Sequence, residues 1–413
     1  MVSPSAVPAP VQPATRLAWL DALRGIAALL VALHHASYLY LPSVQTGLTG
    51  RFDPGWYGVL VFFLVSGYIV PASLERHGSV RRFWIGRFFR IYPLLAVACA
   101  IAVLPVVLGA GRLRAGLDEY DTATALAAHL TMLQDVLAVP NAMNVLWTLS
   151  YEMVFYLLVV ALFVAGAHRR SAGVAAGLAA TALLAGGLLP TALLSRALGA
   201  DLVVALAAAL LVAAIAAAVS DRPALRAAGG LLGGLLALAL VVVNGRMSPG
   251  EGLVILAVMF TGTAVYRAEH GQVSRPVTAL AAVAVLAASV AAGAQDGLRA
   301  WLFWSVPMVL AAATFAVAWT LRARSVPRWL AGLGTVSFSV YLLHPLLLMA
   351  SNLFFGTSGQ DEAFALGAFV VALLAVSWAA HRWIEAPAQR FGKRLGRRPV
   401  PPAEPARVSV PVP

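Results

Sequence analysis

The sequence predicts an all-α, polytopic transmembrane helical bundle of about 10–12 spans with both termini in the cytoplasm. Of the 413 residues, 61% are hydrophobic and only 11% are charged. Apolar runs of about 17–22 residues, long enough to cross a bilayer, recur from end to end. The basic residues lie between these runs, so the net charge of +12 indicates membrane topology and not nucleic-acid binding. The single cysteine, Cys99, excludes an intramolecular disulfide and a cysteine metal cluster.

Twelve apolar segments account for most of the chain. In order they are 20–41, 56–74, 91–110, 146–166, 172–190, 201–219, 227–243, 250–266, 277–293, 300–320, 333–354 and 362–381. The count becomes ten or eleven if the Ala/Leu-rich hairpin at 201–243 or one weak span does not cross. A further apolar piece at 125–139 is too short to span comfortably, which predicts an interfacial or re-entrant helix.

Loop charge predicts the orientation and the character of the two ends. With the N-terminus inside, the outer loops hold six of the 29 basic residues, which leaves 23 in the cytoplasm. These six are Arg51, Arg112, Arg114, Arg196, Arg246 and Arg299. Residues 1–15 are rich in Pro and Ala and lack signal-peptide features, so we expect a disordered tail. Residues 387–413 are expected to form a basic, Pro-rich cytoplasmic tail near anionic headgroups.

The first segment carries ionisable side chains inside a hydrophobic run, namely Asp21, Arg24, His34 and His35. Such groups are costly in a membrane and tend to face a protein interior or a wet cavity. Arg24 and His35 are eleven positions apart, about 20° beyond three turns, so they share a helix face with a rise of roughly 16 Å. His34 points about 80° away from Arg24. The alternative is a solvated helix end with a hydrogen-bonded core histidine.

Two motifs lie near the first three spans. In Arg87-Phe88-Phe89-Arg90, at the predicted cytoplasmic mouth of the third span, the arginines share a helix face and present planar forks suited to phosphate oxygens. A positive-inside anchor for lipid headgroups explains the same charges. In the second span, the pair Ser66-Gly67 within FFLVSG permits the close approach of a ligand or of another helix.

Three further motifs place polar groups in later spans. WTLSYE at 147–152 puts Glu152 at a depth similar to that of His35, which predicts a general base with its orienting carboxylate; a structural ion pair with an arginine is the alternative. SVYLLHP at 339–345 adds Tyr341 and a second intramembrane histidine, His344. The sequence HRWIEAP at 381–387 ends the last span. Taken singly, the last two motifs are typical of structural roles.

Together and in this order, these motifs resemble the acyltransferase-3 family of integral-membrane O-acyltransferases. The resemblance covers residues 20–390, and the hairpin at 201–243 is its least similar part. It implies a transmembrane acyltransferase domain at 16–386. Such a domain transfers an acyl group, often acetyl, from cytoplasmic acyl-CoA to a hydroxyl of a sugar, glycan, lipid or metabolite. The short tail suggests the stand-alone form, similar to enzymes that acylate macrolide sugars.

The resemblance also implies roles for particular residues. His35 matches the essential histidine, Arg24 its partner, and Arg87 and Arg90 the pair linked to the CoA end. With Glu152 as a further catalytic candidate, we expect Ser66, Tyr341 and His344 to line the substrate site. We expect no metal and no cofactor other than acyl-CoA as co-substrate, and a multi-pass location in the plasma membrane.

Two other classes of protein fit parts of the sequence. A secondary transporter or exporter also has many spans and intramembrane charges, but transporters usually show related halves with a site between them, and this chain shows no internal repeat. A non-catalytic membrane scaffold leaves the ionisable stripe of the first helix without an explanation.

Overall fold

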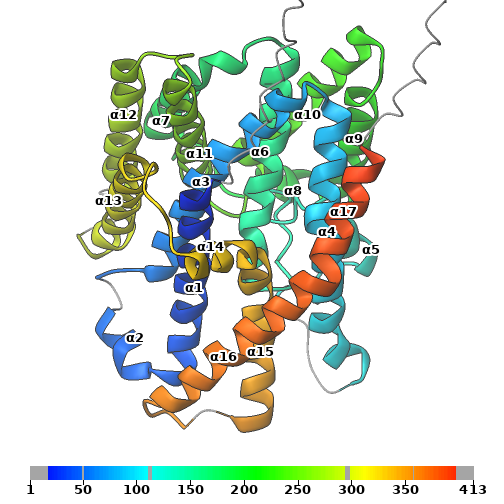
Figure 1. Ribbon diagram of the computed structural model, residues 1–413. Helices are drawn as coiled ribbons and strands as arrows, with labels where there is room; N and C mark the ends of the chain where they lie inside the picture. The colour runs from blue at the N-terminus through cyan, green and yellow to red at the C-terminus, as the bar shows by residue number, and fades with distance from the viewer. Residues whose placement is uncertain (1–16, 49–50, 110–113, 294–297, 357, 397–413) are drawn as a thin grey trace, which may run out of the picture.

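A computed structural model of the chain describes residues 17–48, 51–109, 114–293, 298–356 and 358–396. Within these residues the fold is an all-α bundle without strands (Figure 1). Ten of its helices are long and apolar enough to cross a membrane, which confirms the predicted polytopic helical bundle. Arg112, the tail at 1–15 and the end of the tail at 387–413 lie outside the described residues.

The ten candidate spans include every longer helix except α7 and α12. They are α1 (Ala18–Tyr40), α3 (Pro54–His77), α4 (Val80–Val107), α6 (Trp147–Val164), α9 (Ala200–Ala218), α10 (Pro223–Val243), α11 (Pro249–Glu269), α13 (Leu298–Thr320), α15 (Ser337–Phe355) and α16 (Ala363–Ala380). The remaining elements are α2 (Pro42–Leu48), α5 (Thr122–Leu130), η1 (Asn144–Leu146), η2 (His168–Arg170), α7 (Ser171–Ala185), α8 (Leu193–Leu198), α12 (Arg275–Gly293), α14 (Arg328–Thr335), η4 (His381–Glu385) and α17 (Ala386–Leu395).

The hairpin at 201–243 forms two of the ten candidate spans, α9 and α10. The weak members are the predicted segments 172–190 and 277–293, which form α7 and α12. Helix α7 has 15 residues, and the apolar part of α12 that lies at Arg275–Ala291 is likewise shorter than the 18 residues required of a candidate span. They pack against one another and against α11, as their neighbouring positions in Figure 1 show.

Glycines let the central helices approach closely. A Cβ on Gly67 of α3 would lie 1.8 Å from the Met259 carbonyl oxygen of α11, and one on Gly262 would lie 2.2 Å from the Leu64 carbonyl oxygen. A Cβ on Gly334 of α14 would lie 1.9 Å from the Asp21 carbonyl oxygen of α1. Small residues therefore allow backbone-to-backbone packing, the usual basis of helix association in membranes.

One end of the bundle is held by a buried ion pair. Arg267 of α11 is 1% exposed and pairs with Glu75 of α3, while its Nε donates to the Ser171 hydroxyl at the start of α7 at 2.8 Å. The same guanidinium donates to Gln272 at 2.6 Å. Because a buried arginine must be paired, this cluster fixes the ends of three helices relative to one another.

The last candidate span is a long helix with one π-helical turn. It runs through α16, the π-helical η4 and α17, crossing the bundle obliquely in Figure 1. Glu385 in this turn is 3% exposed and accepts a hydrogen bond from Ser339 of α15. The HRWIEAP motif therefore ties the last span to α15. Residues 386–395, at the start of the predicted tail, form α17.

The region predicted as a short interfacial or re-entrant helix is only half helical. Helix α5 ends at Leu130, and residues 131–143 continue as an irregular, mostly buried segment. Its backbone polar groups need internal partners. Part of this need is met by side chains, because the Gln134 amide donates to the Leu146 carbonyl at 2.9 Å and the Ser150 hydroxyl accepts from the Asp135 backbone N–H at 3.2 Å.

Candidate active site

Two histidines from distant parts of the chain meet inside the bundle. His35 of α1 and His344 of α15 approach to 2.9 Å between Nδ1 and Nε2, with nearly parallel rings at an interplanar angle of 15°. His344 is fully buried. The sequence predicted both as intramembrane histidines but did not predict that they pair.

The hydrogen bonds of the pair assign its protons. His344 Nδ1 lies 3.1 Å from the Val340 carbonyl oxygen, which can only accept, so this nitrogen carries the proton. In a neutral imidazole the other nitrogen, Nε2, is then an acceptor. His35 must donate to it from Nδ1. The Nε2 atom of neutral His35 therefore keeps its lone pair, as a general base requires.

A pocket lies beside the histidine pair. It has a volume of about 460 Å³, and its polar lining comes from His35, Tyr38, Asn144 and Asn352. A second pocket of about 280 Å³, lined in part by Arg114, shares Asn144, Pro345 and Met349 with the first. Both are mostly apolar in lining, with a few polar groups that could orient a bound molecule.

The irregular segment 131–143 helps to form the wall of the second pocket, which Ala142 and Met143 line. Within it, Asn141 donates to the Asp135 carboxylate at 3.0 Å and accepts from the Gln134 amide at 3.1 Å. Burial raises the pKa of Asp135, and burial lowers the pKa of Arg114, whose guanidinium reaches the Asn141 carbonyl at 3.5 Å. None of the sequence motifs indicated this network or the contribution of Asn144 and Arg114.

Arg24 lies in a separate group of charges. Its guanidinium stacks over the Phe62 ring of α3 at 5.5 Å from the ring centroid. Asp21, Arg90 and Glu152 are near enough to act on its charge. Arg24 and His35 therefore occupy two levels of α1, as their spacing predicted, and each level has its own neighbours.

Glu152 belongs to the Arg24 level, so the predicted pairing of Glu152 with His35 is wrong. Glu152 accepts a hydrogen bond from Tyr156, one turn along α6. The reason is the depth at which the span begins: Asn144 lines the pocket beside His35, and Glu152 lies eight residues, about 12 Å, farther along. His35 is roughly 16 Å from Arg24 along α1, so the carboxylate meets the arginine.

The two arginines of the RFFR motif reach the same charge group. Arg87 is 9% exposed, with its guanidinium 5.3 Å from the Phe83 ring and 5.2 Å from the Tyr156 ring. Arg90 is partly buried and acts on both Arg24 and Tyr156. Contact with both aromatic rings orients the planar guanidinium of Arg87, which lysine could not reproduce.

Tyr341 connects the two levels. Its ring lies 6.0 Å from the Phe62 ring and 6.0 Å from the His344 ring, measured between centroids. Its hydroxyl is within 2.8 Å of the Thr148 hydroxyl. Ser66, by contrast, is buried next to Gly67 where α3 packs on α11, which favours the helix-packing interpretation of that motif.

His34 has a structural partner of its own. Its Nε2 lies 3.4 Å from the carboxylate of Asp53, the residue that caps α3 by accepting from the Trp56 N–H at 2.9 Å. Adjacent histidines of α1 thus face different surroundings, as the helix geometry predicted.

The structure so far defines a class: a multi-pass membrane protein with a buried histidine pair beside a pocket and a group of arginines at another level. A family model described as an acyltransferase domain matches residues 17–382. The chain therefore belongs to the acyltransferase-3 family, as its motifs suggested. No solved structure matches the chain.

Individual relatives match about a third of the chain. Nodulation protein 10 of Rhizobium leguminosarum is 32% identical over 33% of this chain and 41% of its own. Acyltransferase MdmB of Streptomyces mycarofaciens is 35% identical over 34% of this chain and 38% of its own. Peptidoglycan O-acetyltransferase OatA of Listeria monocytogenes is 26% identical over 34% of this chain and 23% of its own. The matched region thus spans less than half the length of each relative.

Proposed function

We propose that the protein is an O-acyltransferase that moves an acetyl group from acyl-CoA to a hydroxyl of a sugar, glycan or glycosylated metabolite. The observation that carries the proposal is the His35–His344 pair, which leaves a basic imidazole nitrogen beside a pocket. Family membership supports acyl transfer. The names of two relatives, an acyltransferase and a peptidoglycan O-acetyltransferase, support acetyl transfer to a hydroxyl.

In this proposal His35 is the general base. A hydroxyl is a poor nucleophile at neutral pH, and His35 Nε2 removes its proton as the oxygen attacks the thioester carbonyl. The carbon–sulfur bond then breaks, and the imidazolium returns the proton to the departing CoA thiolate. His344 acts as a positioning residue, because accepting from His35 Nδ1 holds the ring orientation and the tautomer. General base catalysis of this kind contributes about 10²–10⁴-fold in rate.

The arginine group is suited to the donor. CoA carries several phosphates and cannot enter hydrocarbon, so its head stays at the basic mouth while the arm carries the thioester inward. Arg87 and Arg90 are the residues we assign to the phosphates, and Arg24 continues the positive charge toward His35. Glu152 offsets part of this charge and so lets three arginines lie close together. The plasma membrane is the location we propose.

The test uses purified protein in nanodiscs, labelled acetyl-CoA and a panel of glycosides. We expect label in an alkali-labile ester on at least one glycoside, and loss of that product in His35→Gln. If protein shown to be folded leaves the label in acetyl-CoA with every acceptor, the proposal is contradicted. Vesicle uptake of an unmodified glycoside by the same protein would support a transporter instead.

A further inference from the structure

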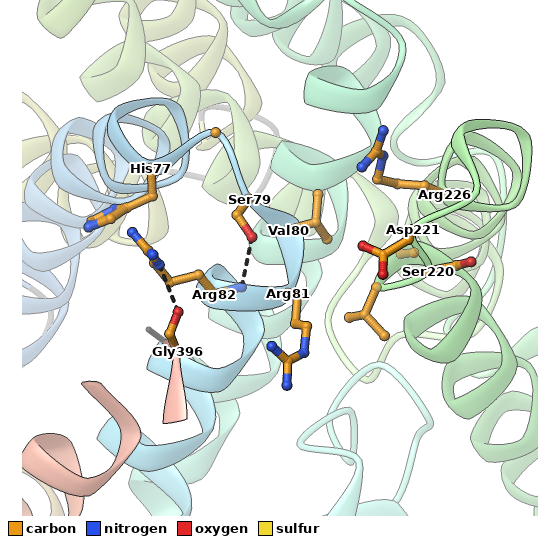
Figure 2. Close-up of a pocket in the computed structure, with 12 residues that line it drawn as sticks. His77, Ser79, Val80, Arg81, Arg82, Ser220, Asp221, Arg226 and Gly396 are labelled. Atoms are coloured by element: carbon orange, nitrogen blue, oxygen red, sulfur yellow. Dashed lines mark hydrogen bonds between the residues drawn. The ribbon is translucent and has the colours of Figure 1, made fainter. Parts of the chain in front are cut away.

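A third pocket lies at the end of the bundle that holds the junction of α3 and α4. It has a volume of about 320 Å³ and lies between that junction, the loop joining α9 to α10, and the end of α17. Figure 2 shows Arg81 and Arg82 on one side and Asp221 and Arg226 on the other. Neither the site described above nor any of its motifs includes these residues.

The charge of this pocket favours an anion. Three arginines and one carboxylate line it, and His77, Ser79 and Ser220 add further hydrogen-bonding groups. Arg82 is held in place because its Nε donates to the Gly396 carbonyl oxygen at 3.1 Å. Guanidinium forks match phosphate oxygens, and such charge-assisted hydrogen bonds are among the stronger ones in proteins.

The pocket also has features that a bare phosphate does not need. The Asp221 carboxylate would repel a phosphate but can accept hydrogen bonds from a ribose hydroxyl or from the amino group of a base. The volume falls at the lower end of the range for pockets that hold small organic ligands. A nucleotide with a phosphate on its ribose meets both requirements better than a lipid headgroup does.

The position along α4 connects this pocket with the proposed donor site. Arg81 and Arg82 lie in the first turn of α4, and Arg87 and Arg90 lie roughly 7–14 Å farther along the same helix. Acyl-CoA carries phosphate in two places, a diphosphate bridge and a phosphomonoester on the ribose. Two groups of arginines spaced along one helix fit a ligand with two separate phosphate positions.

We propose that this pocket binds the nucleotide end of the acyl-CoA donor, with the ribose phosphate held by Arg81 and Arg226. The inference rests on the proposed function. It assigns a role in donor binding to the hairpin α9–α10, the part of the chain least similar to the family, because Asp221 and Arg226 come from that hairpin.

The experiment measures binding of CoA, 3′-dephospho-CoA and adenosine 3′,5′-bisphosphate to the full chain in nanodiscs by calorimetry. For Arg226→Gln we expect the affinity for CoA to fall about tenfold, with the affinity for 3′-dephospho-CoA unchanged. Arg81→Gln, on the opposite wall, should behave in the same way. Arg222→Gln is the matched control, since Arg222 is exposed in the same loop and does not line the pocket.

Several outcomes overturn the inference. If Arg226→Gln weakens the binding of CoA and of 3′-dephospho-CoA equally, or if Arg222→Gln has the same effect as Arg226→Gln, the arginines attract anions non-specifically and do not bind the ribose phosphate. If anionic phospholipid in the nanodisc competes with CoA in the parent protein but not in Arg226→Gln, the pocket holds a lipid headgroup. Failure of the folded parent protein to bind CoA at all rejects the proposed donor, whereas CoA binding that is unaffected by Arg226→Gln and Arg81→Gln rejects only this pocket.

Discussion

At the scale of single residues, the chemistry depends on which histidine nitrogen is free. Two successive hydrogen bonds, from His344 to the Val340 carbonyl and from His35 to His344, place the lone pair on His35 Nε2. His34 makes a different contact, with Asp53. The two adjacent imidazoles have similar depth and chemistry but different neighbours, so a comparison of the two isolates the effect of position.

The first prediction concerns His35. His35→Ala should lower acyl transfer by about 10²-fold or more, with folding and CoA binding kept, because the base is lost while the arginine group remains. His34→Gln should keep most of the transfer rate and instead lower thermal stability, because it weakens a contact with the cap of α3. Rates per folded molecule and melting curves check both variants. Equal losses of rate would indicate general helix damage, and loss at His34 alone would mean that the active face is placed wrongly.

The second prediction concerns the donor. Arg90→Ala and Arg87→Ala should each raise the KM for acyl-CoA about tenfold or more, since charge-assisted contacts are worth about 1.5–3 kcal/mol, and should leave the KM for the acceptor nearly unchanged. Arg87→Lys should rescue only in part, because lysine lacks the planar guanidinium that lies against the rings of Phe83 and Tyr156. Initial-rate kinetics with each substrate varied in turn are the measurement. An unchanged donor KM in a folded Arg87→Ala, Arg90→Ala double variant would return both residues to the role of topology anchors.

At the scale of helices, hydropathy and spacing predicted where most spans lie and which residues share a face of α1. They could not predict contacts between helices. His35 meets His344 because α1 packs on α15, and that contact depends on lateral packing that a single helix does not encode. The depth of Glu152 was missed for a related reason: a buried irregular segment precedes α6, and its length inside the bundle is not visible in its composition.

The third prediction tests the close contact between α3 and α11. Gly67→Ala should destabilise the protein by about 1–3 kcal/mol or more, because the added Cβ would lie 1.8 Å from the Met259 carbonyl oxygen and the helices must move apart. Gly86→Ala is the matched control on an exposed helical position with no atom within 4 Å of the added Cβ. It should be neutral or slightly stabilising, since alanine favours helix. Thermal unfolding in detergent measures both, and equal stability of the two variants would contradict the packing.

At the scale of the whole molecule, charge is divided between two ends. The Glu75–Arg267 pair and the arginine-lined pocket of Figure 2 both lie at one end. At the other end, acidic side chains accept hydrogen bonds from the short helices α2 and α5: Asp361 from Ser43, and Asp201 from Thr124. Basic residues retained on one side of a membrane are typical of the cytoplasmic face. The end with the arginine-lined pocket is therefore the one that should meet cytoplasmic CoA.

The fourth prediction is this topology. Both termini should lie in the cytoplasm, because 23 of the 29 basic residues then fall inside. Helices α7 and α12 must then both cross, because loss of α7 would put the α9–α10 loop on the membrane side opposite to the α3–α4 junction, with which it forms one pocket, and loss of α12 alone would put residue 413 outside. Reporter fusions at residue 413 and in the loop at 112–118 give opposite signals if the orientation is right, and a third fusion in the loop at 186–192 shows whether α7 crosses. An extracytoplasmic signal at residue 413 would place the arginine-lined pocket outside the cell, away from any supply of acyl-CoA, and would reject both the orientation and the donor site.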